Sequence, residues 1–318
     1  MKGTAYGQWA AFMRLYIFFL VLLGTLAAPT TERSIGQEII PRSDDIKQCS
    51  QNCSTCAAPS LPGSTSIQPG TNSISSRQEK ILSKRVMSNP WDEPWHKDMT
   101  RYVKDLGDNV PYVNLDSVRG GPQSIAFFAE LGKNPLSFGM GRLTGCVSVA
   151  VVSRKAVYIS HHWEVGAYSV GNWKPTSDDH FQRYVLDELS HGAGRDMPSL
   201  SQYAGESGPF ANRYQPAAFI VHRHSSNRPK YDEGYNKKNI DLGVHVANIL
   251  GFEPNLALYS RAGDAIEDSM QGVVLFQYDP DGLADCEQQS MTRLWLEEKL
   301  LFSDIYDPVE GQKIEGDN

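Results

Sequence analysis

The sequence is short of positive charge and of long apolar stretches. Its 30 Lys and Arg residues are outnumbered by 37 Asp and Glu residues, which leaves a formal net charge of −7. A surface with this balance offers no basic groove for a phosphate backbone, so we expect no nucleic-acid partner. After the N-terminal region no segment is long and apolar enough to span a bilayer, so we expect no membrane span in the mature chain.

Several signatures of catalysis and of metal binding are also absent. There is no Gly-x-Ser-x-Gly turn to present a serine nucleophile, and the glycine-rich stretch GMGRLTG lacks the Gly-Lys-Ser/Thr ending of a phosphate loop. Asp279–Gly282 (DPDG) lacks the further acidic ligands of a calcium loop and predicts a hairpin turn. His222 and His224 share one strand face and, with His245 or Asp241, offer zinc ligands, but the pattern favours an exposed strand edge. We therefore expect no metal ion and no cofactor.

The N-terminus has the form of a secretory signal. Lys2 and Arg14 supply positive charge. The uncharged run Leu15–Ala28 is about 14 residues long, shorter than the roughly 20 that span a bilayer. We predict a signal peptide over residues 1–27 and a secreted, extracellular protein; an uncleaved anchor is the alternative.

Residues 28–85 have the composition of a disordered prosegment. They are rich in Ser, Pro, Thr, Gly, Gln and Asn, and hold too few apolar residues to offset the entropy of ordering. Asn52 begins an Asn-x-Ser acceptor for glycosylation, and Lys84-Arg85 resembles the dibasic site at which secretory proproteins, notably fungal ones, are cut. Three cysteines lie close together here: Cys49, Cys53 and Cys56. No fourth metal ligand of the usual kind follows them, which favours a small disulfide loop or an intermolecular link.

The remainder of the chain has a globular composition. Helix-like and strand-like segments are interspersed without a regular βαβ rhythm, which favours an α+β fold with a largely antiparallel or mixed sheet. We expect one domain over residues 86–312 and a tail over 313–318. Helices are predicted at Gly121–Lys133, Thr176–Gly192 and Asn239–Gly251. Strands are predicted at Cys146–Val152, Ala156–Trp163, Pro216–His224, Gly272–Gly282 and Thr292–Phe302.

One predicted hairpin carries a cysteine at its start and two histidines at its end. Cys146 follows Gly145, which allows a close backbone approach or a positive φ, and backbone N–H groups around such a turn can point at an oxyanion. The link SRKA is short and polar, so the start of the first strand lies beside the end of the second. His161 and His162 point to opposite faces, so only one of them can face Cys146 and help to form a thiolate. The spacing alone does not choose between them.

The motif LTGC, with a histidine fifteen residues after the cysteine, resembles the cysteine deamidase core of the cytotoxic necrotizing factors. Those bacterial toxins carry Leu-Ser-Gly-Cys and a catalytic histidine at the same spacing. The chemotaxis receptor deamidase CheD and a Burkholderia lethal factor share that fold. The chain is also similar to uncharacterised secreted proteins of filamentous fungi in the Gly-Cys strand, the block SRKAVYISHHWE, a YDP hairpin and a preceding Lys-Arg site. Another aromatic residue often fills the position of His162 in them, which favours His161 as the catalytic histidine.

The resemblance implies two packed mixed or antiparallel sheets flanked by helices, and a toxin-like or effector enzyme. Cys146 would attack an exposed glutamine carboxamide of a protein substrate, and His161 would protonate the departing ammonia. Water would then hydrolyse the thioester, or an amine would replace water and give transglutamination. Val113 and Asn114 lie at about the distance before Cys146 at which the toxins have a backbone carbonyl and an asparagine that support the histidine. Thr144 stands where they have serine, directly before Gly145.

A catalytically silent binding or effector protein of the same fold is the alternative. If the chain is cut after Arg85, Cys146 and Cys286 are the only cysteines left, and secreted proteins tend to pair their cysteines. A buried inert thiol is a further alternative, and a cysteine protease, which would cleave peptides, is a third hypothesis. The sequence leaves open the substrate, the oligomeric state, and whether the prosegment is removed or inhibitory.

Overall fold

The computed structural model describes residues 87–314, apart from 89, 91–93, 96, 114–123, 142, 171–172, 195, 225–228, 261–269 and 283–287. All of the described residues belong to one unit, Pro41–Asn318. The predictions for the signal peptide, the prosegment with its three cysteines, Asn52 and Lys84-Arg85 lie outside the described residues. So do those for Asn114, Cys286 and the last residues of the tail.

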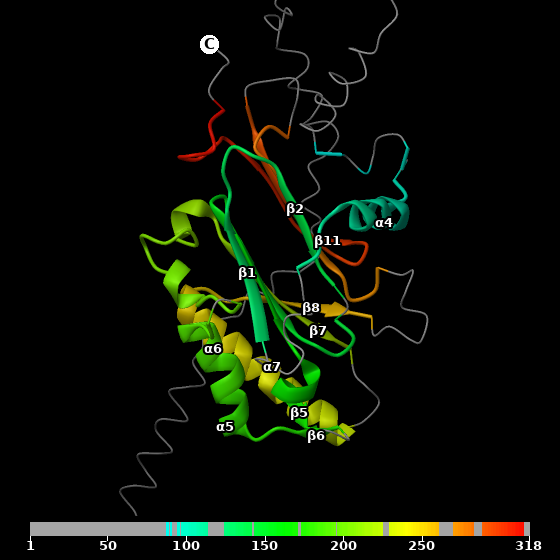
Figure 1. The fold of residues 1–318 in the computed structure, drawn as a ribbon, viewed down its shortest axis with the longest axis vertical. Helices are drawn as coiled ribbons and strands as arrows, with labels where there is room; N and C mark the ends of the chain where they lie inside the picture. Colours follow the sequence, from blue (N-terminus) through cyan, green and yellow to red (C-terminus); the bar gives the residue numbers. More distant parts are fainter. Residues whose placement is uncertain are drawn as a thin grey trace, which may run out of the picture. The chain divides into compact units, whose positions relative to one another are not determined.

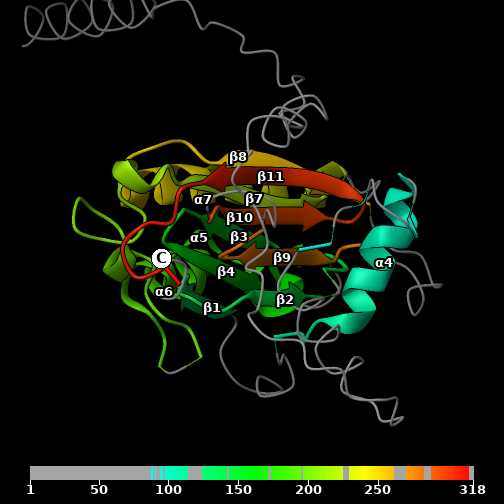
Figure 2. The same ribbon diagram turned by 90° about the horizontal axis from the view of Figure 1, so that it is seen from above.

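Two β-sheets pack face to face (Figure 1). The larger sheet has the order β1-β4-β3-β7-β8 and pairs its strands antiparallel except for β7 and β8. Its strands are β1 (Ser124–Glu130), β3 (Ser148–Val152), β4 (Ala156–His162), β7 (Ala217–Arg223) and β8 (Asn255–Tyr259). The smaller, antiparallel sheet has the order β11-β10-β9-β2, which can be followed in Figure 2. Its strands are β2 (Leu136–Met140), β9 (Val274–Asp279), β10 (Ser290–Leu296) and β11 (Lys299–Tyr306). The predicted α+β class with two packed mixed or antiparallel sheets is confirmed.

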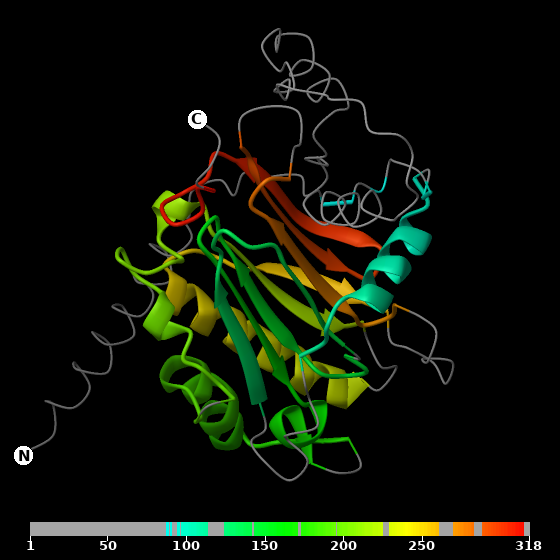
Figure 3. The same cartoon turned by 45° about the horizontal axis from the view of Figure 1, so that its top comes forward.

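Helices cover the outer face of each sheet. Helix α7 (Pro229–Leu250) lies across the larger sheet (Figure 3), beside α5 (Asp178–Phe181), a π-helical turn (Gln182–Leu186) and α6 (Asp187–His191). Helix α4 (Met99–Asn109) packs on the smaller sheet. Because β3 and β4 lie in the middle of the larger sheet, they are buried on both faces, which explains why they read as nearly continuous apolar runs. No helix in the described part of the chain is long and apolar enough to cross a membrane.

Most of the predicted elements are present. The helix predicted at Thr176–Gly192 begins after Ser177, whose side chain accepts the N–H of His180, and ends at Gly192, which has a φ of 78°. The helix predicted at Asn239–Gly251 is the second half of α7. The single strand predicted at Thr292–Phe302 is instead parts of β10 and β11, joined by a tight turn at Glu297, where φ is 55°.

The helix predicted at Gly121–Lys133 is wrong, because this segment contains strand β1. β1 pairs along its whole length with β4, from Ser124 opposite His162 to Glu130 opposite Ala156. Its two central phenylalanines pack on opposite faces: Phe127 against the smaller sheet and Phe128 against the helix-covered core. A strand that uses both faces has consecutive apolar residues, which resemble a short buried helix in the sequence.

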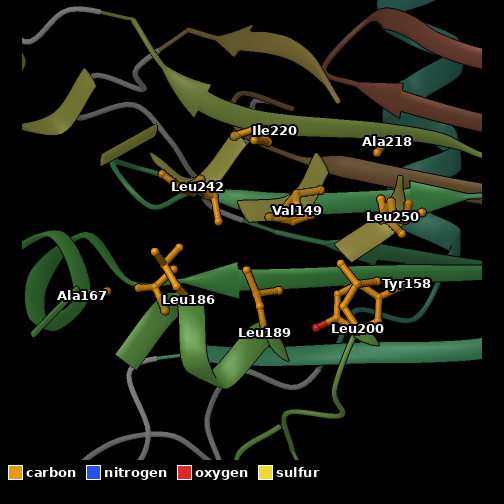
Figure 4. Close-up of a cluster of buried hydrophobic side chains, with 14 of the residues drawn as sticks. Val149, Tyr158, Ala167, Leu186, Leu189, Leu200, Ala218, Ile220, Leu242 and Leu250 are labelled. Atoms are coloured by element: carbon orange, nitrogen blue, oxygen red, sulfur yellow. The ribbon is translucent and has the colours of Figure 1, made fainter. Parts of the chain in front are cut away.

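The packing of α7 on the larger sheet contributes to the stability of the fold. Figure 4 shows Leu242 of α7 among the side chains of the larger sheet, and Leu242 is fully buried. We expect Leu242→Ala to lower the free energy of unfolding by about 2–5 kcal/mol, because it leaves a cavity. Ile240, on the same helix and 63% exposed, is the matched control, and Ile240→Ala should change stability by no more than about 0.5 kcal/mol. Urea denaturation of both variants measures the difference, and equal costs would contradict this packing.

Candidate active site

The predicted hairpin of β3 and β4 is confirmed, and its register decides which side chains meet. Val147 and His162 are hydrogen-bonded partners: the N–H of each donates to the carbonyl of the other, at 2.9 and 2.8 Å. The same register holds farther along the hairpin, where Ala150, Val151 and Val152 lie opposite Ile159, Tyr158 and Val157. Continued by one residue, it places Cys146 opposite Trp163 at the open end of the hairpin.

Cys146 and His161 lie on the same face of the larger sheet. Opposite residues in an antiparallel pair share a face, and side chains alternate along a strand. In this register His161 stands diagonally across from Cys146 and directly opposite Ser148, at separations across which long side chains interact. This face is turned toward the smaller sheet, because Cys146 belongs to the apolar cluster between the two sheets.

The candidate pair is buried, and His161 has no hydrogen-bond partner. His161 is 2% exposed and Cys146, a free thiol, is 8% exposed. Within the described residues neither ring nitrogen of His161 nor Oγ of Ser148 accepts or donates a hydrogen bond, so none joins the ring to the thiol. The ring packs against that of Trp163, with centroids 4.5 Å apart. Buried polar groups are normally paired, so a polar group that reached this place would gain hydrogen bonds.

His162 is satisfied on the opposite face. Its Nδ1 lies 2.8 Å from Oγ of Ser124, and its Nε2 lies 2.9 Å from Oγ of Ser160. Its exposure is 0%. Both ring nitrogens are therefore occupied within the protein, which is the environment of a structural histidine. The prediction that the two histidines point to opposite faces is confirmed, and His161 is the one on the face of Cys146.

Burial keeps both members of the candidate pair uncharged. It raises the pKa of the Cys146 thiol to about 12 and lowers the pKa of the His161 ring to about 4, because desolvation disfavours the charged forms. Backbone N–H groups of Glu164 and of Cys146 itself lower the pKa of the thiol, while the negative charge of Glu164 raises it. In the resting state the thiol and the imidazole on this face are therefore both neutral.

Residue 145 must be a glycine because the side chain of Glu164 packs directly against its Cα. A Cβ at this position would overlap the carboxylate of Glu164. Gly145 is not among the glycines with positive φ, so close approach is the reason that applies. The hydroxyl of Tyr235 donates to the Gly145 carbonyl at 3.1 Å, and that of Tyr259 donates to the Cys146 carbonyl at 2.9 Å. Because a trans peptide sets N–H opposite C=O, the N–H of Cys146 points away from the hydroxyl of Tyr235.

The other residues predicted to support the site are less closely involved. Thr144 is exposed in the turn before Gly145. Val113 is partly buried against the cluster that holds Cys146, and its N–H donates to the carbonyl of Gly139 at 2.9 Å. The expected hydrogen bond from His161 to an upstream carbonyl is not formed in the described structure, since both ring nitrogens lack partners.

The segment around His222 is not the exposed strand edge that its pattern predicts. β8 pairs alongside β7, and His222 is only 8% exposed, with Nδ1 3.1 Å from the carbonyl of Arg223. His245 is 2.7 Å from Oγ of Ser190. Among the described residues, no group of three or more His, Cys, Asp and Glu side chains could hold a metal ion.

A buried ion cluster beside Cys146 escaped the sequence analysis. Nε of Arg223 lies 3.3 Å from Oε1 of Glu164, and its Nη2 donates to Oδ1 of Asp232 at 3.1 Å. The arginine side chain is 0% exposed. The one available signal was an arginine within an apolar strand, because a buried charge needs a partner.

Comparison with known proteins leaves the chain unassigned. No family model and no curated protein matches it. Among solved structures, the C-terminal domain of CNFy from Yersinia pseudotuberculosis is similar over 57% of this chain and 58% of that domain, with 14% sequence identity and a TM-score of 0.26. The chain thus spans less than two thirds of that domain, and the likeness is too loose to assign an activity.

The close approach at Gly145 predicts a position-specific cost. We expect Gly145→Ala to lower the free energy of unfolding by about 1–3 kcal/mol, because Glu164 is held by its partners and cannot simply move away. In a Glu164→Ala background the same change should cost much less. Gly132→Ala is the control, since a Cβ there meets no atom within 4 Å and should be neutral or slightly stabilising. Denaturant unfolding measures all four variants; an equal cost of Gly145→Ala in both backgrounds would refute the contact.

The buried neutral histidines predict a dependence of stability on pH. Because folding lowers the pKa of His161 to about 4, its contribution is complete above a pH of about 6.5 and is lost as the pH falls toward 4. Glu188 and Asp279 act in the opposite direction, because burial raises the pKa values of their carboxyl groups to about 7 and about 6. The contribution of His161 is therefore obtained by comparing the pH dependence of stability of the parent protein with that of His161→Gln. Over this range the stability of His161→Gln should fall less steeply, by at most about 1.4 kcal/mol per pH unit. Urea titrations at several pH values test this, and parallel curves would contradict it.

Proposed function

We propose that this chain is a Cys–His hydrolase that acts on the glutamine carboxamide of a protein substrate. The observation that carries the proposal is the arrangement of the hairpin: a free thiol and an imidazole without partners share one buried face of adjacent strands. A His beside a Cys supplies the base that makes a thiolate. His161 is assigned this role because His162 is already bound by two serines on the other face.

The proposed reaction has two steps. Cys146 gives its proton to His161, and Sγ attacks the carboxamide carbon to form a C–S bond and a tetrahedral oxyanion. The C–N bond then breaks, His161 returns the proton to the departing nitrogen, and ammonia leaves a thioester. In the second step His161 takes a proton from water and the hydroxide attacks the thioester carbon to form a C–O bond. The C–S bond then breaks, His161 returns its proton to Sγ, and the glutamate product leaves. An amine in place of water gives transglutamination.

Burial shapes how the proton moves. Because the site disfavours an isolated thiolate and an isolated imidazolium, the two charges form together, by transfer from sulfur to ring. The N–H groups of Cys146 and Glu164 favour the anionic sulfur. The hydrogen bond between base and nucleophile tightens only when substrate is bound in many enzymes, which is consistent with its absence in the free site.

Limited access favours a side chain as substrate over a peptide backbone. With Cys146 only 8% exposed, a narrow carboxamide on two methylene groups can approach the sulfur more readily than a peptide bond flanked by side chains. This supports the deamidase hypothesis over a cysteine protease. We propose in addition that the protein is secreted after removal of its signal peptide and acts as a toxin or effector.

The roles of the two histidines can be separated by kinetics. We expect His161→Ala to slow ammonia release from a glutamine-rich protein such as denatured casein by about a hundredfold or more, because the acid–base group is lost. His162→Ala should retain the rate while lowering the free energy of unfolding by about 1–3 kcal/mol, since two buried serines lose their partner. Cys146→Ser is the inactive reference. Peptide mass spectrometry of the casein locates glutamine-to-glutamate conversions and any backbone cleavage.

The alternative, a catalytically silent protein, predicts that Cys146 is not available as a free thiol. If Cys146 is bridged to Cys286 in the purified protein, it will resist alkylation until a reductant is added, and the nucleophile proposal fails. A free thiol that alkylates in the native protein, together with ammonia release that depends on His161, supports the enzyme.

A further inference from the structure

A buried cluster of three charges lies beside the nucleophile, and the proposed reaction does not use it. Arg223 stands at the end of β7, where its side chain pairs with Glu164 and Asp232 at 3.3 and 3.1 Å. The hydroxyl of Tyr231 donates to Oε1 of Glu164 at 2.7 Å. Burying such ions is expensive, and apolar side chains of similar volume often stabilise a fold equally well. The cluster therefore calls for a role other than stability.

The cluster is tied to the backbone that presents the cysteine. The guanidinium carbon of Arg223 lies 4.4 Å from the ring centroid of Tyr235, whose hydroxyl holds the carbonyl of Gly145. The carboxylate of Glu164 lies against the Cα of Gly145 so closely that no side chain fits there. One arginine thus supports both the residue before Cys146 and the turn that follows β4.

Glu164 acts on the sulfur in two opposite ways. Its backbone N–H lowers the pKa of the Cys146 thiol, and its carboxylate charge raises it; the backbone effect is the larger of the two, and both are smaller than the effect of burial. Three titratable side chains interact electrostatically with this sulfur: Glu164, Tyr168 and Tyr259. Arg223 contacts Glu164, Tyr235 holds the Gly145 carbonyl, and His161 lies on the same sheet face as Cys146. The position of the Glu164 backbone therefore matters more to the thiolate than its charge does.

We propose that Glu164 and Arg223 are positioning residues for Cys146. Their ion pair holds the turn after β4 against Gly145, so that the N–H groups of Glu164 and Cys146 converge on Sγ. Asp232 and Tyr231 complete the support by fixing the far side of the arginine and of the carboxylate. This inference rests on the proposed function, since it concerns the same nucleophile.

The two effects of Glu164 can be separated by two substitutions. Glu164→Gln keeps the length of the side chain and an oxygen that can accept from both Tyr231 and Arg223, so the turn stays in place, but it removes the charge that raises the pKa of the thiol. It should therefore speed iodoacetamide alkylation of Cys146 at mildly alkaline pH, by up to about tenfold for each unit by which the pKa falls. Glu164→Ala removes the link to Arg223, so the turn and its N–H are released. Because the backbone effect is the larger, alkylation should slow, by about tenfold per pKa unit.

The measurement resolves Cys146 from the other cysteines of the full chain. Trypsin cuts after Arg142 and Arg154, so Cys146 is recovered alone in peptide 143–154, whose labelling is followed by mass spectrometry. The control is Asp178→Asn, which breaks an ion pair with Lys237 whose side chains are 73% and 57% exposed and should leave the rate unchanged. Arg223→Lys is the second variant; a lysine cannot bridge Glu164 and Asp232 in the same way, so it should slow alkylation as Glu164→Ala does.

A merely structural role gives a different result. Loss of a structural contact would loosen the site, expose the buried thiol and speed alkylation in every variant. The inference is overturned if Glu164→Ala and Arg223→Lys both alkylate as fast as the parent or faster. The alkylation rate requires no substrate. Shifts in the expected directions without ammonia release from casein would refute the proposed function and leave the positioning role standing. Ammonia release with unshifted rates would refute only the positioning role.

Discussion

Two backbone hydrogen bonds between Val147 and His162 decide which chemistry this fold can support. Side chains alternate along a strand, so a slip of one residue in this pairing would exchange the two faces of the hairpin. His162 would then leave the two serines that bind its ring nitrogens and lie under the smaller sheet. The register is held by more than these two bonds, because β3 and β4 are buried on both faces and are flanked by β7 and β1. A slip would move each side chain of the slipped strand to the opposite face of the sheet, so the packing of both cores would be disrupted at once.

The same burial that fixes the register determines the charge state of the site. Cys146 and His161 face a core between two sheets, where an isolated charge is strongly disfavoured. A site of this kind reacts slowly with reagents that need a preformed thiolate, and it becomes more reactive when a ligand and the backbone N–H groups can share the charge. The unpaired ring of His161 and the unpaired hydroxyl of Ser148 are consistent with this, since a polar ligand that reaches them gains hydrogen bonds that the free protein lacks.

Local pattern in the sequence was enough to predict the hairpin and to show that only one of its two histidines faces Cys146. The two-residue period separates the faces of His161 and His162, but the choice of His161 came from the resemblance to the cytotoxic necrotizing factors. Local pattern failed where the contacts that determine the structure join residues far apart in the sequence. The segment of β1 resembled a helix because Phe127 and Phe128 serve two different cores, which no window of sequence can show. The pairing of Glu164 with Arg223 was missed for the same reason: 59 positions separate them, and only the alignment of β4 and β7 on either side of β3 brings them together.

Two unusual features near the cysteine have one physical explanation. A glycine before Cys146 and a fully buried arginine in a neighbouring strand look unrelated in the sequence. In the structure both follow from the position of Glu164, whose carboxylate fills the space where a side chain of residue 145 would lie and supplies the charge that Arg223 needs. If this region served packing alone, an apolar residue at 164 and a side chain at 145 would fill it at lower cost. The ion pair and the close contact at Gly145 fix the orientation of the backbone as well as filling space. The proposed positioning of the N–H groups near Sγ depends on that orientation.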